Sequence, residues 1–77
     1  MTLRVSGIIT IVQESRFRFV DDGGRGYLFV LGRGARADVT DLCDWRDRGA
    51  RVAVTYTGAP DLGAVATRIQ EEASQGP

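Results

Sequence analysis

Residues 16–31 read RFRFVDDGGRGYLFVL, and this stretch decides the fold class. Its first residues alternate Arg with Phe, a period of two that is typical of a strand with one buried face. Residues 21–26 then combine two Asp with three Gly, residue types that tolerate the positive φ of hairpin turns. A second apolar run follows in residues 27–31. We therefore expect an antiparallel hairpin with strands at 16–20 and 27–31.

Upstream of this hairpin, residues 3–12 predict another strand. The apolar positions that alternate with the rest, and that we expect on one face, are Leu3, Val5, Ile9 and Ile11. Gly7 lies inside this run, and a glycine there indicates a bulge, a sharp bend or a close approach of another backbone. Small closed barrels need such bends, so the pattern is consistent with one.

Downstream of the hairpin, the period changes from two to that of a helix. Apolar residues recur at helical spacing at Val39, Leu42 and Trp45. Asp38 and Asp41 are three positions apart and form a potential capping pair, while Gly49 can end a helix in the left-handed conformation. The spacing predicts one short helix over about residues 39–48.

The remainder predicts two more strands. Alternation over residues 51–56 indicates the fourth strand, residues 58–61 read as a turn, and residues 63–70 indicate the fifth, with Val65 and Ile69 facing the same way. We expect a single domain over residues 1–70 and a flexible polar tail over residues 71–77.

Length and composition are those of one small globular domain. The 77 residues are 43% hydrophobic and 26% charged, a balance that excludes a disordered chain. No apolar run approaches the length of a membrane-spanning helix, and the first residues lack the pattern of a signal peptide. The expected compartment is the cytoplasm, with no membrane partner.

The residue types that are absent exclude several kinds of active site. The chain has no His and one Cys, so the common zinc sites, Cys-His pairs, Ser-His-Asp triads and internal disulfides cannot form. Cys43 lies in the expected helix, where a half-buried structural thiol is the simplest interpretation. Asp21 and Asp22 precede two glycines and read as turn residues. We expect no enzyme, no catalytic residue, no metal site and no cofactor.

Charge is distributed unevenly along a chain whose net charge is zero. All ten basic residues are Arg. Residues 1–37 carry a net charge of +3, and residues 38–77 carry a net charge of −3. A neutral chain is not a general nucleic-acid coating protein, yet a basic half can still bind a polyanion.

The order of elements resembles that of the OB-fold. Three strands, one helix and two further strands in about 70 residues is the order of this five-stranded Greek-key barrel, whose helix lies between the third and fourth strands. An SH3-like barrel is the alternative, but such barrels usually lack a ten-residue helix at this position. The expected fold class is all-β with one short helix, in an OB-fold-like barrel.

Within that class, residues 16–19 and 28–30 resemble in part the two nucleic-acid motifs of the cold-shock domain. The departures are Arg18 in place of a motif glycine, Leu31 and Gly32 in place of the second motif's His and Phe, and Ile11-Val12 in place of Trp-Phe. The resemblance implies that a ligand binds on the face of the second and third strands.

The direction of the side chains on these two strands decides what that face offers. Phe17 and Phe19 are expected to face inward, because the opposite register would bury the guanidinium of Arg18 without a partner. On the third strand either alternate pair can face inward. If Leu28 and Val30 do so, Tyr27 and Phe29 lie outside beside Arg16 and Arg18. Otherwise both rings belong to the core, and the arginines serve only solubility.

The outward register predicts a surface for single-stranded nucleic acid. Bases stack on aromatic rings while guanidinium groups contact phosphates. The candidate binding residues are Arg16, Arg18, Arg25, Tyr27, Phe29, Arg33 and Arg36. The alternative is a protein-interaction or assembly module, since halves of opposite charge can pair head to tail in a weak homo-oligomer or dock on a charged protein partner.

Overall fold

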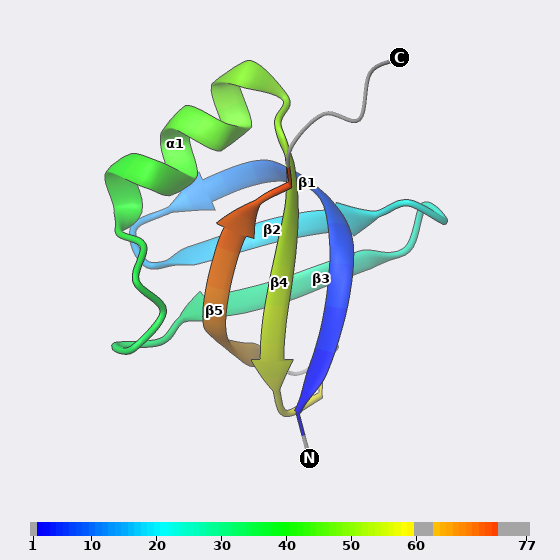
Figure 1. Ribbon diagram of the computed structural model, residues 1–77, viewed down its shortest axis with the longest axis vertical. Coiled ribbons are helices and arrows are strands. Elements are labelled where there is room, and N and C mark those ends of the chain that lie inside the picture. The colour runs from blue at the N-terminus through cyan, green and yellow to red at the C-terminus, as the bar shows by residue number, and fades with distance from the viewer. Residues whose placement is uncertain (1, 60–62, 73–77) are drawn as a thin grey trace.

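The computed structural model describes residues 2–59 and 63–72. It contains five strands and one helix in the order that the sequence predicts (Figure 1): β1 (Leu3–Gln13), β2 (Arg16–Asp21), β3 (Gly26–Leu31), α1 (Val39–Arg48), β4 (Arg51–Thr57) and β5 (Ala64–Glu71). In this part of the chain no helix has the length and apolar character needed to cross a membrane.

The five strands form a closed barrel with the spatial order β1-β2-β3-β5-β4. Strand β1 pairs antiparallel with both β2 and β4, and the parallel pair of β3 with β5 completes the circle. This is the OB-like arrangement expected from the order of elements, and it shows that the barrel is closed. Figure 1 shows α1 lying over one end of the barrel.

Strand β1 pairs with both β2 and β4, and Gly7 lies where the two pairings overlap. The Cα of Gly7 is paired with Asp21 on one side and with Val52 on the other. A Cβ atom at Gly7 would lie 2.0 Å from the carbonyl oxygen of Val20. The close backbone approach that the sequence indicated here is confirmed, and only glycine permits it.

A bulge follows in the same strand. The pairing with β2 shifts between Ile9 and Ile11, so Thr10 is an extra residue. Ile9 is 2% exposed but Ile11 is 48% exposed, and Leu3 at the start of the strand is also exposed. The expectation that Ile11 shares the buried face of Ile9 is wrong, because the extra residue reverses the alternation.

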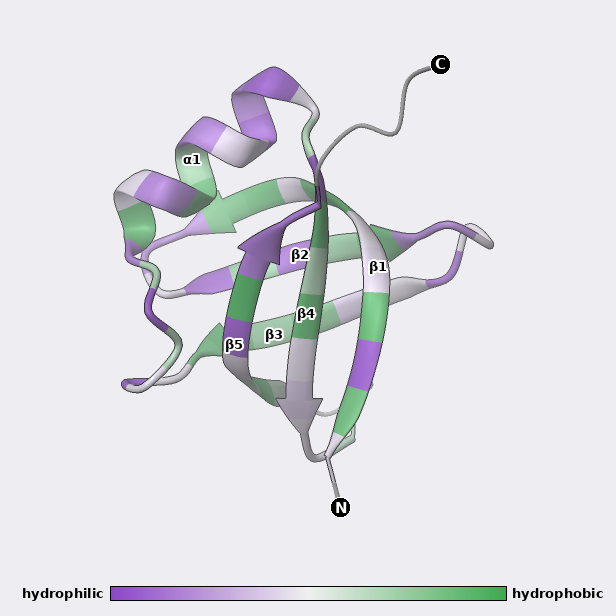
Figure 2. Ribbon diagram, viewed as in Figure 1, coloured by the Kyte–Doolittle hydropathy of each residue, from purple (hydrophilic) through white to green (hydrophobic). Residues whose placement is uncertain are grey.

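An aromatic cluster fills the barrel. The ring centroids of Phe17 and Phe29 are 5.4 Å apart, and those of Phe29 and Tyr56 are 5.1 Å apart. Leu42 of α1 is fully buried against this cluster, and Trp45 packs on it in part. The helix therefore closes one end of the barrel with apolar side chains, while hydrophilic residues make up much of its remaining surface (Figure 2).

The helix begins and ends where the sequence predicts. The Asp38 carboxylate accepts a hydrogen bond from the Asp41 N–H, and the Asp41 carboxylate accepts one from the Asp38 N–H, both at 3.0 Å. This is a capping box. Gly49 adopts φ 61°, and its N–H donates to the Arg46 carbonyl. Both predicted caps are confirmed.

Strand β5 differs from the prediction in two respects. Val65 is 41% exposed whereas Ile69 is 4% exposed, so their expected common direction is wrong. The pairing with β4 shifts at Thr55 and leaves Thr67 as an extra residue between Ala66 and Arg68 on β5. Glu71, which was expected in the tail, belongs to the strand.

The residues after β5 and the turn before it are described only in part. The Glu72 N–H donates to the Arg51 carbonyl, which extends the ordered domain beyond residue 70. Gly58 has the positive φ of 95° that suits a turn. Pro60 and Asp61 of the expected turn, and residues 73–77 of the expected tail, lie outside the described residues.

Candidate nucleic-acid interface

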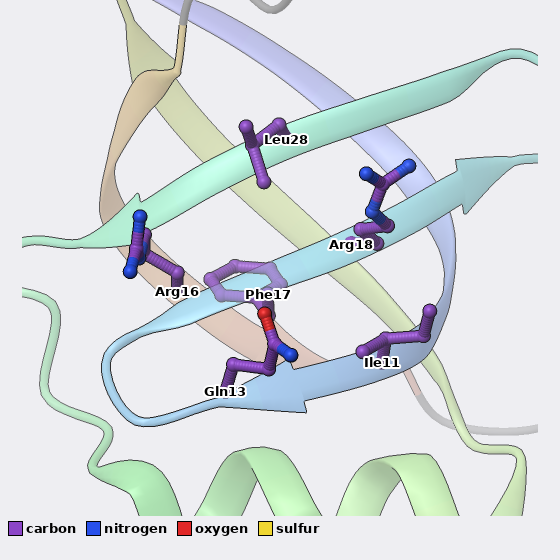
Figure 3. Close-up of a pocket in the computed structure, with 6 residues that line it drawn as sticks. All are labelled: Ile11, Gln13, Arg16, Phe17, Arg18 and Leu28. Atoms are coloured by element: carbon purple, nitrogen blue, oxygen red, sulfur yellow. The ribbon is translucent and has the colours of Figure 1, made fainter.

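Strand β2 presents its arginines to solvent and its phenylalanines to the core. Phe17 is 1% exposed and Phe19 is fully buried, whereas Arg16 and Arg18 are exposed. The predicted register of this strand is confirmed. Figure 3 shows the two arginine side chains on the same side of β2.

Strand β3 has the register opposite to the one that placed aromatic rings outside. Phe29 is fully buried and Tyr27 is 9% exposed, while Leu28 lies outside at 36%. Directly paired residues of neighbouring strands share a face. Tyr27 is paired with Phe19 and Phe29 is paired with Phe17, so both rings follow the inward direction of the phenylalanines. The expectation that Tyr27 and Phe29 lie exposed beside the arginines is wrong.

The Tyr27 hydroxyl reaches a partner at the end of the barrel. It donates to the Asp21 carboxylate at 2.9 Å, and that carboxylate also accepts the backbone N–H groups of Gly23 and Arg25. The hydrogen bonds from the Arg25 N–H and the Tyr27 hydroxyl lower the pKa of Asp21. Burial, and then the same hydrogen bond, raises the pKa of Tyr27. Asp21 therefore organises the hairpin turn, as its sequence context predicted.

Two rows of side chains cross the outer surface of β1, β2 and β3. One row contains Ile11, Arg18 and Leu28, and the other contains Gln13, Arg16 and Val30. We call these six residues the arginine face. Each arginine is flanked on neighbouring strands by the other members of its row, so this surface combines positive charge with aliphatic side chains.

A depression of about 180 Å³ lies on this face. Its lining residues, labelled in Figure 3, are Ile11, Gln13, Arg16, Phe17, Arg18 and Leu28. A second depression, of about 430 Å³, adjoins it and shares Arg18 and Leu28. No carboxylate lines either one, so each favours groups that accept hydrogen bonds or carry negative charge.

Ion pairs neutralise arginines elsewhere in the molecule. Arg46 pairs with Asp47 at 3.0 Å, Arg48 pairs with Asp44 and Glu71, and Arg51 pairs with Asp22 and Glu72. Within residues 2–59 and 63–72, the remaining seven arginines form no ion pair. Six of these seven lie in the first half of the chain: Arg4, Arg16, Arg18, Arg25, Arg33 and Arg36.

Arg25, Arg33 and Arg36 lie in loops rather than on the outer face of β2. Arg25 lies in the turn between β2 and β3, with its guanidinium carbon 5.3 Å from the centroid of the Tyr27 ring. Arg33 and Arg36 follow the opposite end of β3, in the loop that leads to α1 (Figure 1). The structure thus brings Arg16 and Arg18 together and places the other three candidates at the two ends of the hairpin.

Four residues that line the depression were not among the predicted site residues: Phe17, which was expected in the core, and Ile11, Gln13 and Leu28. Ile11 is directed outward by the bulge at Thr10, Leu28 by the register of β3, and Gln13 by its place after the bulge. The sequence carried no signal for the bulge. For β3, the register that buries Phe29 was one of the two alternatives that the sequence left open.

The other candidate chemistry is limited in the part of the chain that the structure describes. Cys43 is half-buried, as expected for a structural thiol. Residues 2–59 and 63–72 contain no cluster of three side chains of the metal-binding types close enough to hold an ion. Comparison of the sequence with protein-family models and with curated proteins found no match.

Proposed function

We propose that this protein is a small, non-enzymatic module that binds single-stranded nucleic acid through the arginine face. The observation that carries the proposal is the position of Arg16 and Arg18. Both side chains are exposed, both line one depression without a carboxylate, and neither forms an ion pair with any described residue. Guanidinium groups in such a setting are free to contact phosphates.

The chemistry of the face suits a flexible strand. A guanidinium plane can lie flat on a base as well as contact a phosphate, so the buried rings of β2 and β3 are not needed for stacking. Ile11 and Leu28 add apolar surface for the base. The phenylalanines that carry the resemblance to the cold-shock motifs are buried, so the choice of this face depends on the exposed positions of Arg16 and Arg18.

Fluorescence anisotropy of labelled single-stranded RNA and DNA tests the proposal. Three phosphate contacts, from Arg16, Arg18 and one loop arginine, predict a roughly 20-fold loss of affinity for a fourfold rise in salt, because each contact on a single strand contributes a slope near −0.7. The RNA and DNA arms also show which nucleic acid is preferred. No binding at low salt would overturn the proposal.

A charge-matched pair of variants locates the site. Arg16→Ala with Arg18→Ala should reduce binding about tenfold or more and lower the salt slope. Arg4→Ala with Arg68→Ala removes the same charge from another surface, where both residues flank Thr55 on β4. This control should change affinity about twofold or less. Equal losses in the two variants would show that net charge, rather than this face, governs binding.

Exposed aliphatic residues favour protein interaction as a second candidate function. Ile8, Ile11, Leu28 and Val65 are 41%, 48%, 36% and 41% exposed, and the last of these is paired with Val30 of the arginine face. Apolar patches on a protein surface often mark partner sites. Light scattering over a range of protein concentrations tests self-association. A rising mass that persists when Arg16 and Arg18 are replaced would support assembly through these aliphatic residues.

A further inference from the structure

The depression on the arginine face combines apolar walls with hydrogen-bond donors, as a subsite for one base requires. Its volume of about 180 Å³ is many times the ~10–15 Å³ that a cavity needs to hold one water. Ile11 and Leu28 form apolar walls from the two strands beside β2, and Phe17 contributes to the floor. An unstacked base can therefore exchange its contacts with neighbouring bases for contacts with the side chains of Ile11 and Leu28.

Hydrogen-bond donors outnumber acceptors around this depression. The two guanidinium groups supply only N–H donors, and Gln13 supplies an amide with one acceptor oxygen. Adenine carries its exocyclic amine beside N7, so one guanidinium fork would meet a donor there. The N1–H and exocyclic amine of guanine need an acceptor, which the Gln13 amide oxygen supplies. Guanine carries two adjacent acceptors, O6 and N7, which match the fork of one guanidinium.

Arg18 is the arginine best placed to read the base. It lies directly between Ile11 and Leu28, so both neighbours flank the aliphatic stem of its side chain. It also belongs to both depressions, whereas Arg16 belongs to one. Arg16 is two residues away, roughly 6.6 Å along the strand, which leaves it available to contact a phosphate next to that base.

We infer that the depression between Arg16 and Arg18 is a guanine-preferring subsite, in which Arg18 donates to O6 and N7 while Gln13 contacts the remaining polar edge. The inference rests on the proposed function and deepens it. It predicts base preference at one position of an otherwise sequence-tolerant interaction.

The test uses the full chain and uridine oligonucleotides that differ at one central base. Guanine should bind about tenfold more tightly than adenine, a purine of the same size, because one bidentate contact is lost. Replacing that guanine with 7-deazaguanine, which lacks N7, should bring affinity close to the adenine value. One guanine per strand also avoids association of the strands with each other.

Two protein variants assign the reading group. Arg18→Lys keeps the positive charge but removes the fork, so the ratio of guanine to adenine affinity should lose most of its value. Arg4→Lys is the matched control on another surface, beside Thr55 of β4, and should keep the preference. Circular dichroism and urea unfolding verify that both variants fold as the parent does.

The outcomes separate the subsite from the proposed function. Equal binding of the guanine and adenine strands would overturn the subsite and leave nucleic-acid binding standing. A preference that survives in Arg18→Lys would show that Arg18 is not the reader. Absence of binding to every oligonucleotide would overturn both, and concentration-dependent mass in the same samples would then direct attention to a protein partner.

Discussion

At the scale of single residues, the bend of β1 depends on the missing side chain of Gly7. The strand must pair with β2 and β4 in succession, and at the crossing point the Val20 carbonyl occupies the space of a Cβ atom. No flexible side chain can yield there, because the three nearest atoms belong to the backbone of Val20 and Asp21. The barrel therefore tolerates a side chain at Gly7 only by moving one strand away from another.

Gly7→Ala should lower the free energy of unfolding by about 3 kcal/mol, the upper range for overpacking a well-packed interior. Urea unfolding followed by circular dichroism measures the change. Gly34→Ala is the control, because a Cβ at Gly34 meets no atom within 4 Å. Equal stability of the two variants would contradict the close approach at Gly7.

Residue identity also shows what the sequence could predict. On β2 the arginines fix the direction, because one of two registers buries a charge, and the prediction was confirmed. On β3 all of residues 27–31 are apolar or aromatic, so alternation gives no direction of its own. The pairing with Phe17 and Phe19 decides it, and that information lies in the neighbouring strand rather than in β3.

At the scale of elements, the helix was predictable to the residue because its limits are set locally. The capping box and the left-handed Gly49 each depend on residues within one turn of the helix end. The bulges in β1 and β5 were not predictable, since each exists only in relation to the partner strand. This is why the strand order was correct while the exposed directions of Ile11 and Val65 were not.

The capping box of α1 gives a prediction at this scale. Asp38→Ala removes the acceptor for the Asp41 N–H and should lower the free energy of unfolding by about 1 kcal/mol, whereas Asp38→Asn should restore most of it. Thermal or urea unfolding provides the measurement. Thr40→Ala in the same turn serves as the control and should change stability by about 0.5 kcal/mol or less. A neutral Asp38→Ala would mean that packing of Leu42 alone holds the helix.

At the scale of the whole molecule, one carboxylate links the last strand, β5, to the helix α1. Glu71 of β5 accepts hydrogen bonds from the Trp45 indole at 3.0 Å and from Arg48 at 2.6 Å. The hydrogen bond from Arg48 is the main cause that lowers the pKa of Glu71 from its ordinary value of 4.5. A lowered folded-state pKa contributes stability above the unfolded value, and this contribution is lost as pH falls through the folded value.

We therefore expect the wild-type protein to lose stability as pH falls below about 4.5, with Asp21 adding to the loss below its ordinary value of 3.8. Glu71→Gln should be less stable at pH 7 and should show a shallower decline in acid. Urea midpoints between pH 7 and pH 3, read by circular dichroism, measure both effects. Glu14→Gln, in the turn after β1, is the control. A parallel decline in wild type and Glu71→Gln would contradict a role for this carboxylate.

The parallel pairing of β3 with β5 affects how the barrel folds. Residues 29–31 of β3 pair with residues 64–66 of β5. Both α1 and β4 lie between these two segments in the sequence. Long loops must close before such contacts can form, so folding is slow relative to that of a helical domain of this size. Until this seam forms, β3 has an open edge over its whole length. A nascent chain that has completed only β1 to β3 therefore exposes a strand edge and an aromatic layer together, which makes the time between synthesis of β3 and β5 the period of greatest aggregation risk.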